Sequence, residues 1–283
     1  MKVAVIGALG QLGVDVCNEF EKDKVEAVRL DIDNVDITKI DTLNKTLKEI
    51  KPEIIINTAA YHDVEQCEKN PCIAYEVNAI GAKNLALVSN DLNCGLIHIS
   101  TDYVFNGNKD IPYLETDTAF PLNVYGNTKL AGERFISAFA KKFLILRTSG
   151  LFGKSPCRGK GGLNFVELML KLAKERDEVR VVDHEILTPT STLQLARQIV
   201  NLKEPDFYGI AHATPEGYCS WYQFTKEIFR IKGIKTTLNI AKPGEFPEKV
   251  ARPYYSVLEN NILNQYSHNI MNHWSDGLKE YLK

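Results

Sequence analysis

The first half of the chain alternates short apolar runs with stretches in which apolar residues recur at helical spacing. The runs are nearly continuous in Val, Ile and Leu, which is typical of strands buried on both faces of a parallel sheet. The predicted strands cover residues 2–7, 25–31, 53–60, 94–101 and 143–149. The predicted helices cover residues 11–22, 37–52, 72–92 and 124–142. This alternation predicts an α/β fold with a doubly wound (Rossmann) parallel sheet.

The pattern loosens after about residue 150, where a Gly/Lys-rich loop, "GKSPCRGKGG", follows the last regular strand. Beyond it we expect a helix at 164–176, a strand at 179–182, and a helix with a Thr or Ser N-cap within "TPTSTLQLARQIVNL". A strand at 207–213 and a helix at 220–233, ended by Gly233, come next. We therefore predict one domain over 1–150 and a smaller C-terminal lobe over 151–283, whose elements interleave with the sheet.

Composition narrows the class of protein without changing this fold. The 283 residues carry a net charge of −2, which argues against nucleic-acid or membrane-surface binding. The N-terminal apolar run has the length of a strand, so neither a signal peptide nor a membrane span is predicted. Six cysteines without a C-x-x-C pair favour a reduced, cytoplasmic compartment. The scattered histidines predict no metal site.

A glycine-rich turn, "GALGQLG", directly follows the first strand and opens the first helix. Gly7, Gly10 and Gly13 allow a tight turn and close approach of the backbone, while the helix N-terminus offers free N–H groups to a pyrophosphate. Asp31 ends the second strand, where a carboxylate can accept a hydrogen bond from the ribose 2′-hydroxyl and so favour NAD over NADP. Arg29 nearby weakens that preference, and a plain turn residue at position 31 is an equally open alternative.

A second pattern supplies candidate chemistry. Tyr125 and Lys129 are spaced i, i+4 and share a helix face, about 6 Å apart along the axis. We expect the ammonium to lower the phenol pKa and to make Tyr125 a proton donor to a developing alkoxide. This spacing is common by chance, but Thr101 ends the fourth strand, at the sheet edge where such folds bind ligands. Together with the glycine turn, Thr101, Tyr125 and Lys129 predict hydride transfer with NADPH or NADH.

These residues resemble those of the extended short-chain dehydrogenase/reductases and, more narrowly, the dTDP-4-dehydrorhamnose reductase family. The similarity covers nearly the whole chain. It lies in "GALGQLG", "NTAAY", "STDYVFNG", "YGNTKLAGE", "SWYQF" and "RPYYSVL". The last two motifs separate this family from generic epimerases. Domain 1–150 would then be the NAD(P)-binding Rossmann domain, and 151–283 mainly the substrate-binding lobe.

The resemblance implies reduction of the 4-keto group of dTDP-4-dehydro-L-rhamnose, or a close nucleotide sugar, in dTDP-L-rhamnose biosynthesis. Tyr125 would protonate the oxygen on sugar carbon 4, and Lys129 would hold the nicotinamide ribose. The residues expected to contact the cofactor are Gly7, Gly10, Gln11, Leu12, Gly13, Asp31, Asp36, Ile37, Ala59, Ala60, Tyr61 and Lys129. Those expected to contact the substrate are Thr101, Asp102, Tyr103, Trp221 and Arg252. A homodimer is compatible with this assignment, and no other macromolecular partner is expected.

Some features leave the substrate and the function open. Gly150 stands where the family usually has a substrate-contacting Trp, and residues 183–190 depart from the family motif. A non-catalytic cofactor-binding subunit, similar to the regulatory subunit of methionine adenosyltransferase, is one alternative. A sugar-nucleotide epimerase or dehydratase is another, although Asp102 is followed by Tyr103 and not by the second carboxylate of a dehydratase. The intact Thr101, Tyr125 and Lys129 favour a reductase.

Overall fold

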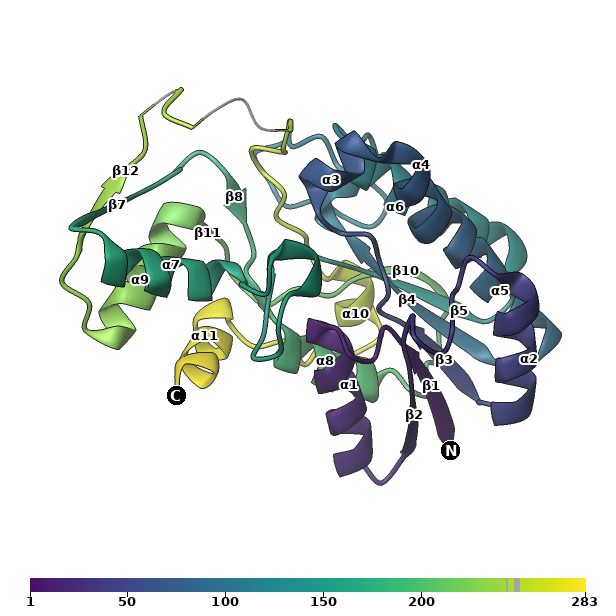
Figure 1. The fold of residues 1–283 in the computed structure, drawn as a ribbon. Coiled ribbons are helices and arrows are strands. Elements are labelled where there is room, and N and C mark those ends of the chain that lie inside the picture. The colour runs from purple at the N-terminus through teal and green to yellow at the C-terminus, as the bar shows by residue number, and fades with distance from the viewer. Residues whose placement is uncertain (243, 247–249) are drawn as a thin grey trace.

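Six parallel strands form the centre of the larger domain (Figure 1). The computed structural model describes residues 1–242, 244–246 and 250–283. In this part of the chain the strand order is β10-β5-β4-β3-β1-β2, with every pair parallel. The strands are β1 (Lys2–Ile6), β2 (Glu26–Leu30), β3 (Ile54–Asn57), β4 (Gly95–Thr101), β5 (Phe143–Thr148) and β10 (Gly209–His212). The predicted doubly wound Rossmann fold is confirmed.

Helices bury both faces of this sheet because alternate side chains of each strand point to opposite sides. Val3 and Val5 of β1 pack with α1 (Gln11–Lys22) and α8 (Thr192–Asn201). Ala4 and Ile6 pack on the other face. The helices of that face are α2 (Ile40–Ile50), α5 (Ala82–Asp91) and α6 (Val124–Phe139). Burying each Val or Ile contributes roughly 1.5–3 kcal/mol, which explains the near-continuous apolar strands.

The helix predicted over residues 72–92 is not continuous. It begins as α4 (Pro71–Tyr75), passes through a π-helical segment η1 (Glu76–Gly81), and continues as α5; a short helix, α3 (Val64–Lys69), precedes it. Asn78 of η1 is buried, accepts a hydrogen bond from Tyr61 N, and donates to Tyr61 O and to Thr128 Oγ1. A π-helical segment replaces the regular hydrogen bonds of the α-helix, and the three hydrogen bonds of Asn78 stabilise the segment here.

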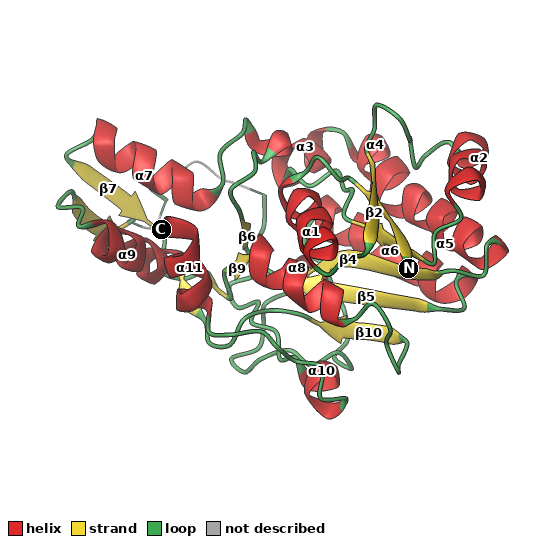
Figure 2. Ribbon diagram, turned by 90° about the horizontal axis from the view of Figure 1, so that it is seen from below, coloured by secondary structure: helices red, strands yellow, loops and turns green. Residues whose placement is uncertain are grey.

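The smaller lobe has its own apolar core beside the sheet domain (Figure 2). Phe152, Val166, Phe224, Ile228 and Leu278 are buried there. Its main elements are α7 (Phe165–Glu175), β7 (Glu178–Val181), α9 (Trp221–Lys232), β12 (Thr237–Ile240) and α11 (Trp274–Leu282). The short elements are η2 (Asp102–Val104), β6 (Leu151–Phe152), η3 (Arg158–Lys160), β8 (Ile186–Leu187), β9 (Thr190–Ser191), β11 (Cys219–Ser220) and α10 (Asn261–Gln265). As predicted, α9 ends at Gly233 in the left-handed conformation.

The second half of the chain also contributes to the sheet domain. Strand β10 pairs with β5 at the sheet edge, and α8 packs against α1. Ser191 occupies the N-cap position of α8, but its side chain makes no capping hydrogen bond. The next residue, Thr192, instead donates its hydroxyl to Asp15 at 2.5 Å. The elements of residues 151–283 are therefore interleaved with the sheet.

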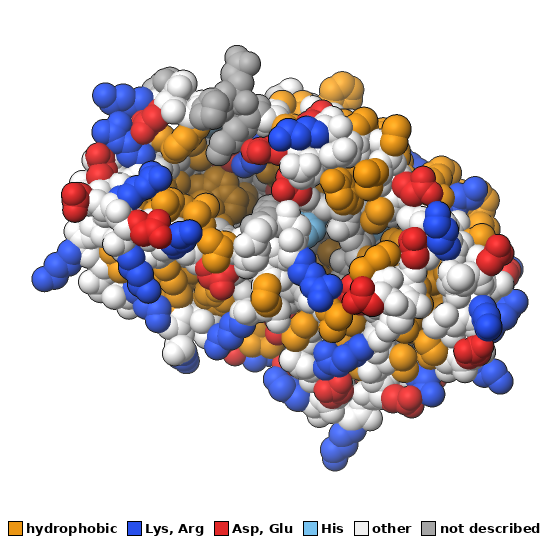
Figure 3. Space-filling view, in the orientation of Figure 1, with side chains coloured by type: hydrophobic (Ala, Val, Ile, Leu, Met, Phe, Trp, Pro, Cys, Tyr) orange, Lys and Arg blue, Asp and Glu red, His pale blue; other side chains and the backbone are white. Residues whose placement is uncertain are grey.

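The described surface mixes charges of both signs. Figure 3 shows basic and acidic side chains interspersed over one face, with a hollow lined by hydrophobic side chains beside the smaller lobe. Within the described ranges, no helix is long and apolar enough to cross a bilayer.

Candidate active site

The predicted site residues follow the carboxyl ends of neighbouring parallel strands. Gly7 follows β1, Asp31 follows β2, Ala59 comes two residues after β3, Thr101 ends β4, and Ser149 follows β5. Parallel strands end at one edge of the sheet, so five segments distant in sequence meet there. This edge also faces the loops that lead into the smaller lobe.

The glycine turn forms a close backbone cradle. A Cβ atom on Gly13 would lie 2.1 Å from the carbonyl oxygen of Gly7, so only glycine allows α1 to start against the end of β1. Gly10 N donates to Gly7 O at 3.0 Å and tightens the turn. Gly10 is also the N-cap of α1, and no side chain caps this helix end. Its first N–H groups and the positive end of its dipole therefore suit a pyrophosphate, so the residues fit a dinucleotide.

Alanine at position 13 is expected to lower the free energy of unfolding by about 2 kcal/mol and to weaken NADPH binding, because the methyl group would press on backbone atoms. Urea denaturation and a fluorescence titration with NADPH measure the two effects. Gly95→Ala is the matched control, because its Cβ would meet its nearest neighbour at 3.6 Å, an ordinary contact. Equal stability of the two variants would contradict the claim that only glycine fits at position 13.

Asp31 is held at the rim of this cradle. Its carboxylate accepts hydrogen bonds from Leu9 N and Ile32 N, both at 2.9 Å. Arg158, in the loop between β6 and α7, lies 3.4 Å from the same carboxylate. Gln11 of the glycine turn donates its side-chain amide to the backbone of that loop, at Gly153 and Ser155. The Gly/Lys-rich loop thus lies against the expected cofactor side of the site.

The remaining residues expected to line the cofactor differ in how far they are buried or hydrogen-bonded within the protein. Ala59 N donates to Asn57 Oδ1, so the chain turns back toward the glycine loop, while the partly exposed Ala60 and Tyr61 follow. Asp36 accepts hydrogen bonds from the backbone and hydroxyl of Thr38. The side chains of Leu12 and Ile37 are buried in the two cores. At positions 12 and 37, therefore, only backbone atoms remain for a ligand.

Tyr125 lies in the first turn of α6, beside the end of β4. Asn123 caps this helix by accepting a hydrogen bond from Gly126 N at 2.8 Å. A Cβ on Gly126 would lie 2.2 Å from Tyr103 O, so this glycine lets α6 approach the segment after β4. The Tyr125 hydroxyl then lies near the side chain of Thr101, which acts to lower the pKa of the phenol, and the Tyr103 ring packs edge-on with its centroid 5.9 Å away. Strand β4 and helix α6 thus bring Thr101 and Tyr125 close together.

The expected lowering of the Tyr125 pKa is wrong for the protein alone. Burial raises the pKa of the Tyr125 phenol, and the hydrogen bond with Thr101 opposes this effect only partly. Low-dielectric surroundings disfavour a phenolate, and Lys129 does not offset that penalty here. A phenol with a raised pKa remains protonated at neutral pH, which is the form required of a proton donor.

Lys129 shares the helix face with Tyr125, but its side chain reaches elsewhere. Its Nζ lies 2.7 Å from the carbonyl oxygen of Ile99 and 3.1 Å from Nε2 of His98. Burial lowers the pKa of Lys129 to about 8, and the charge of Glu133 acts in the opposite direction. The i, i+4 spacing predicted a shared face correctly, but it could not predict that strand β4 provides partners for the amine.

Asp102 is buried, although a contact with the sugar was expected. Its carboxylate accepts hydrogen bonds from the hydroxyls of Thr101, Ser149 and Ser256, at 3.0, 2.8 and 2.6 Å. Burial raises the pKa of Asp102, and these three bonds counteract the shift. The residue therefore ties together the ends of β4 and β5 and a C-terminal segment, and it supports Thr101 instead of presenting a free carboxylate.

A cavity of about 310 Å³ lies near the N-terminus of α6. Leu122, Glu185, Arg252 and Tyr254 are among its lining residues. The buried Nε of Arg252 has no hydrogen-bond partner among the described residues. A guanidinium with unused donors in a cavity suits a phosphate, as expected for Arg252.

Trp221, which the family resemblance places in contact with the substrate, packs against the core of the smaller lobe. Its ring lies 4.2 Å from that of Phe165 in the lobe core, and its Nε1 donates to Glu185 at 3.1 Å. Gly150 has a positive φ of 54°, and a Cβ there would lie 2.8 Å from Leu187. The space beside Gly150, where the family usually has a Trp, is thus occupied by an aliphatic side chain.

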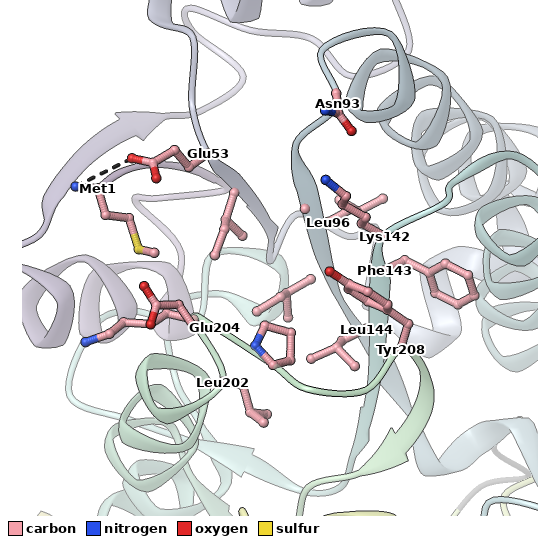
Figure 4. Close-up of a pocket in the computed structure, with 15 residues that line it drawn as sticks. Met1, Glu53, Asn93, Leu96, Lys142, Phe143, Leu144, Leu202, Glu204 and Tyr208 are labelled. Carbon is pink, nitrogen blue, oxygen red and sulfur yellow. Dashed lines mark ion pairs between the residues drawn. The ribbon is translucent and has the colours of Figure 1, made fainter.

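A second hollow, of about 330 Å³, lies at the opposite edge of the sheet (Figure 4). Met1, Glu53, Lys142 and Tyr208 are among its lining residues, and the N-terminal amine lies 3.5 Å from Glu53. It surrounds the amino ends of the strands, whereas open α/β sheets bind ligands at the carboxyl ends. Thr101, Tyr125 and Lys129 line neither hollow, but the cavity at Arg252 lies beside the N-terminus of α6, which carries Tyr125.

The sequence interpretation missed several buried polar residues behind the site. Asn57 and His98 form one pair, and Glu133 and Arg147 form another. A signal was available, because Asn57, His98 and Arg147 interrupt strands that are otherwise apolar, and buried polar residues are uncommon enough to be informative. Among the described residues, no group of three or more His, Cys, Asp or Glu is placed to hold a metal ion.

Comparisons with known proteins identify the family. The family model described as "RmlD substrate binding domain" matches residues 1–283. A spore coat polysaccharide biosynthesis protein of Bacillus subtilis is 38% identical, covering 100% of this chain and 97% of that protein. This degree of similarity extends over both the sheet domain and the smaller lobe.

Two solved structures are similar over the full length. A dTDP-4-dehydrorhamnose reductase from Clostridium acetobutylicum has a TM-score of 0.94 and 41% identity, covering 100% of this chain and 98% of that one. A dTDP-4-dehydrorhamnose reductase from Bacillus anthracis in complex with NADP has a TM-score of 0.94 and 38% identity, covering 99% and 98%. The expected NAD(P)-dependent oxidoreductase is thereby confirmed at the level of the family. The chain belongs to the RmlD substrate binding domain family.

Proposed function

We propose that this protein reduces the 4-keto group of dTDP-4-dehydro-L-rhamnose, or of a closely related nucleotide sugar, with NADPH or NADH. The observation that supports the proposal is that Tyr125, in the first turn of α6, lies near Thr101 at the sheet edge that also carries the glycine cradle. A dinucleotide on that cradle would extend along the same edge toward Tyr125. The full-length similarity to two reductases named for this substrate supports the same conclusion.

In this proposal the backbone of Gly7, Gly10 and Gly13 holds the pyrophosphate, and Lys129 holds the nicotinamide ribose. The bound reduced cofactor supplies a hydride to the carbonyl carbon of the sugar. The hydroxyl hydrogen of Thr101, which points at Asp102 in the protein alone, would turn to the carbonyl oxygen and orient it. Tyr125 gives its proton to this oxygen as negative charge develops there. An alkoxide is more basic than a phenolate, so the transfer is downhill even with a raised phenol pKa.

On the substrate side, Arg252 would pair with the diphosphate. Its partly exposed guanidinium is 3.9 Å from Glu65, a distance that leaves its donors available. Arg252 also acts electrostatically on Tyr103, so the cavity and the Tyr103–Tyr125 pair are adjacent. Asp102 would act through Thr101, by holding its hydroxyl in place until the substrate binds.

The proposal is tested by following the oxidation of NADPH and NADH in the presence of dTDP-4-dehydro-L-rhamnose. We expect oxidation that depends on the nucleotide sugar, with dTDP-L-rhamnose as product. Tight cofactor binding without oxidation would favour the non-catalytic subunit. Conversion of a sugar nucleotide without net oxidation of the cofactor would favour an epimerase.

Arg158→Ala is expected to weaken the binding of NADPH about fivefold and to leave NADH binding unchanged, because a 2′-phosphate near Asp31 would lose its nearest cation. In the protein alone, the guanidinium lies 3.4 Å from the Asp31 carboxylate and is half exposed. Dissociation constants for 2′,5′-ADP and for ADP isolate this effect from catalysis. Lys154→Ala, an exposed residue of the same loop, is the control. Equal weakening of both nucleotides would contradict a role in discriminating between them.

A further inference from the structure

Lys129 is the last member of a buried chain of hydrogen-bonded polar side chains. The other members, His98 and Asn57, have no role in the reduction itself. The Nζ atom of Lys129 is 2.7 Å from Ile99 O and 3.1 Å from Nε2 of His98. On the other side of the imidazole, Nδ1 is 2.8 Å from Nδ2 of Asn57. Asn57, His98 and Lys129 are each at most 2% exposed, so their hydrogens must point at acceptors within this chain.

The backbone decides which way the Asn57 amide faces. Ala59 N donates to Asn57 Oδ1 at 3.1 Å, which leaves Nδ2 directed at His98. The flipped amide would set its own N–H groups against the N–H of Ala59. Asn57 therefore donates to His98, and the Nδ1 atom of His98 carries no proton.

His98 is uncharged in these surroundings. Burial lowers the pKa of His98 well below its usual range. A neutral imidazole keeps one proton, which must be on Nε2 because Nδ1 accepts from Asn57. That N–H faces Lys129 Nζ. An ammonium has only donors, so a charged Lys129 would place N–H against N–H.

An uncharged amine removes this conflict. Its lone pair accepts the hydrogen of His98 Nε2, and one of its own hydrogens goes to Ile99 O. We propose that His98, fixed by Asn57, is a positioning residue that favours the uncharged amine of Lys129 in the cofactor-free protein. This inference rests on the proposed function in one respect: Lys129 holds the nicotinamide ribose there, so its position affects cofactor binding.

The groups that face Lys129 and its helix from neighbouring elements are compatible with an uncharged amine. Glu133 lies one turn further along α6, but Arg147 of β5 and Ser100 of β4 already bind its carboxylate. Asp102 of η2 and Cys67 of α3 act on Tyr125. Burial outweighs the attraction of Glu133 and lowers the pKa of Lys129 to about 8, so the uncharged amine predominates above that pH.

The tautomer of His98 can be measured directly by ¹⁵N NMR of the histidine rings, in the cofactor-free wild-type protein at about pH 9, above the pKa of Lys129. His212 is an internal control: it is fully buried, and its Nδ1 lies 3.0 Å from the carbonyl oxygen of Glu259, to which it must donate. We expect opposite tautomers, with the proton on Nε2 in His98 and on Nδ1 in His212. The spectrum of His98→Gln, which lacks one ring, assigns the signals.

A proton on Nδ1 of His98, or on both of its ring nitrogens, would overturn the proposal. The measurement needs no substrate, cofactor or destabilising variant. Its failure would therefore leave the proposed reductase activity untouched, and a failure of that activity would leave the tautomer result standing.

The positioning role has a second readout in the dissociation constant for NADPH. His98→Leu should weaken binding about tenfold, the scale of one lost hydrogen bond that orients a side chain. His98→Gln should stay within about twofold of wild type, because an amide can accept from Asn57 and donate to Lys129. Equal weakening in both folded variants, or none in His98→Leu, would overturn the positioning role. If His98→Leu does not fold, the tautomer measurement decides.

Discussion

Replacing Tyr125 with phenylalanine is expected to lower the turnover of the 4-keto nucleotide sugar by about 100-fold or more, the usual scale of general acid catalysis. The substitution removes one oxygen atom and leaves the ring against Tyr103. Cofactor binding should change by less than about twofold, because the lost hydroxyl acts on the substrate and only in the transition state. Single-turnover rates and an NADPH titration separate the two effects.

The matched control is Tyr113→Phe, which removes a phenol hydroxyl from a site away from the cradle. Tyr113 is buried, stacks on Phe105 and donates to Asn106 at 3.0 Å. This variant should keep wild-type turnover even if it loses some stability. If Tyr125→Phe retained most of its turnover, Tyr125 would not be the proton donor, and Thr101 or a water molecule would have to supply the proton.

Glu133→Gln is expected to lower the free energy of unfolding by about 3–5 kcal/mol, because it leaves a buried guanidinium without its counter-charge. Arg147 donates two hydrogen bonds to the Glu133 carboxylate, at 2.9 and 2.7 Å, and Ser100 donates a third at 2.5 Å. Both charged side chains are almost fully buried. Stacking of Arg147 on Phe105 at 5.1 Å does not replace the lost charge. Urea denaturation measures the change.

Glu175→Gln provides the comparison at an exposed ion pair. Glu175 lies 3.9 Å from Lys171 on α7, with both side chains more than half exposed. Its loss should cost less than about 0.5 kcal/mol, because solvent already screens the pair. Similar stability losses in the two variants would mean that the Glu133–Arg147 pair is no more important than a surface contact.

The sequence predicted those parts of the site that depend on local geometry. Gly7, Gly10 and Gly13 are dictated by the backbone of a strand–turn–helix unit, and that unit is present as expected. The spacing of Tyr125 and Lys129 places both on one face of α6 because a helix has 3.6 residues per turn. The apolar strands predicted a sheet covered on both faces for the same local reason.

The sequence could not predict where polar side chains find partners across the fold. Asp102 is engaged by Ser149 and Ser256, which are 47 and 154 residues away in the chain. The direction of Lys129 depends on His98 from β4, and the burial that raises the pKa of Tyr125 is set by segments around it. These are tertiary effects, and spacing along one helix contains no information about them.

The central claim is that hydride passes from a bound nicotinamide to carbon 4 of a nucleotide sugar beside Tyr125. The test uses NADPH that carries deuterium at both positions of carbon 4 of the nicotinamide, with NMR analysis of the sugar product. We expect one deuterium at sugar carbon 4 in each dTDP-L-rhamnose formed. Product without deuterium at that carbon, or bound cofactor that never transfers its deuterium, would contradict it.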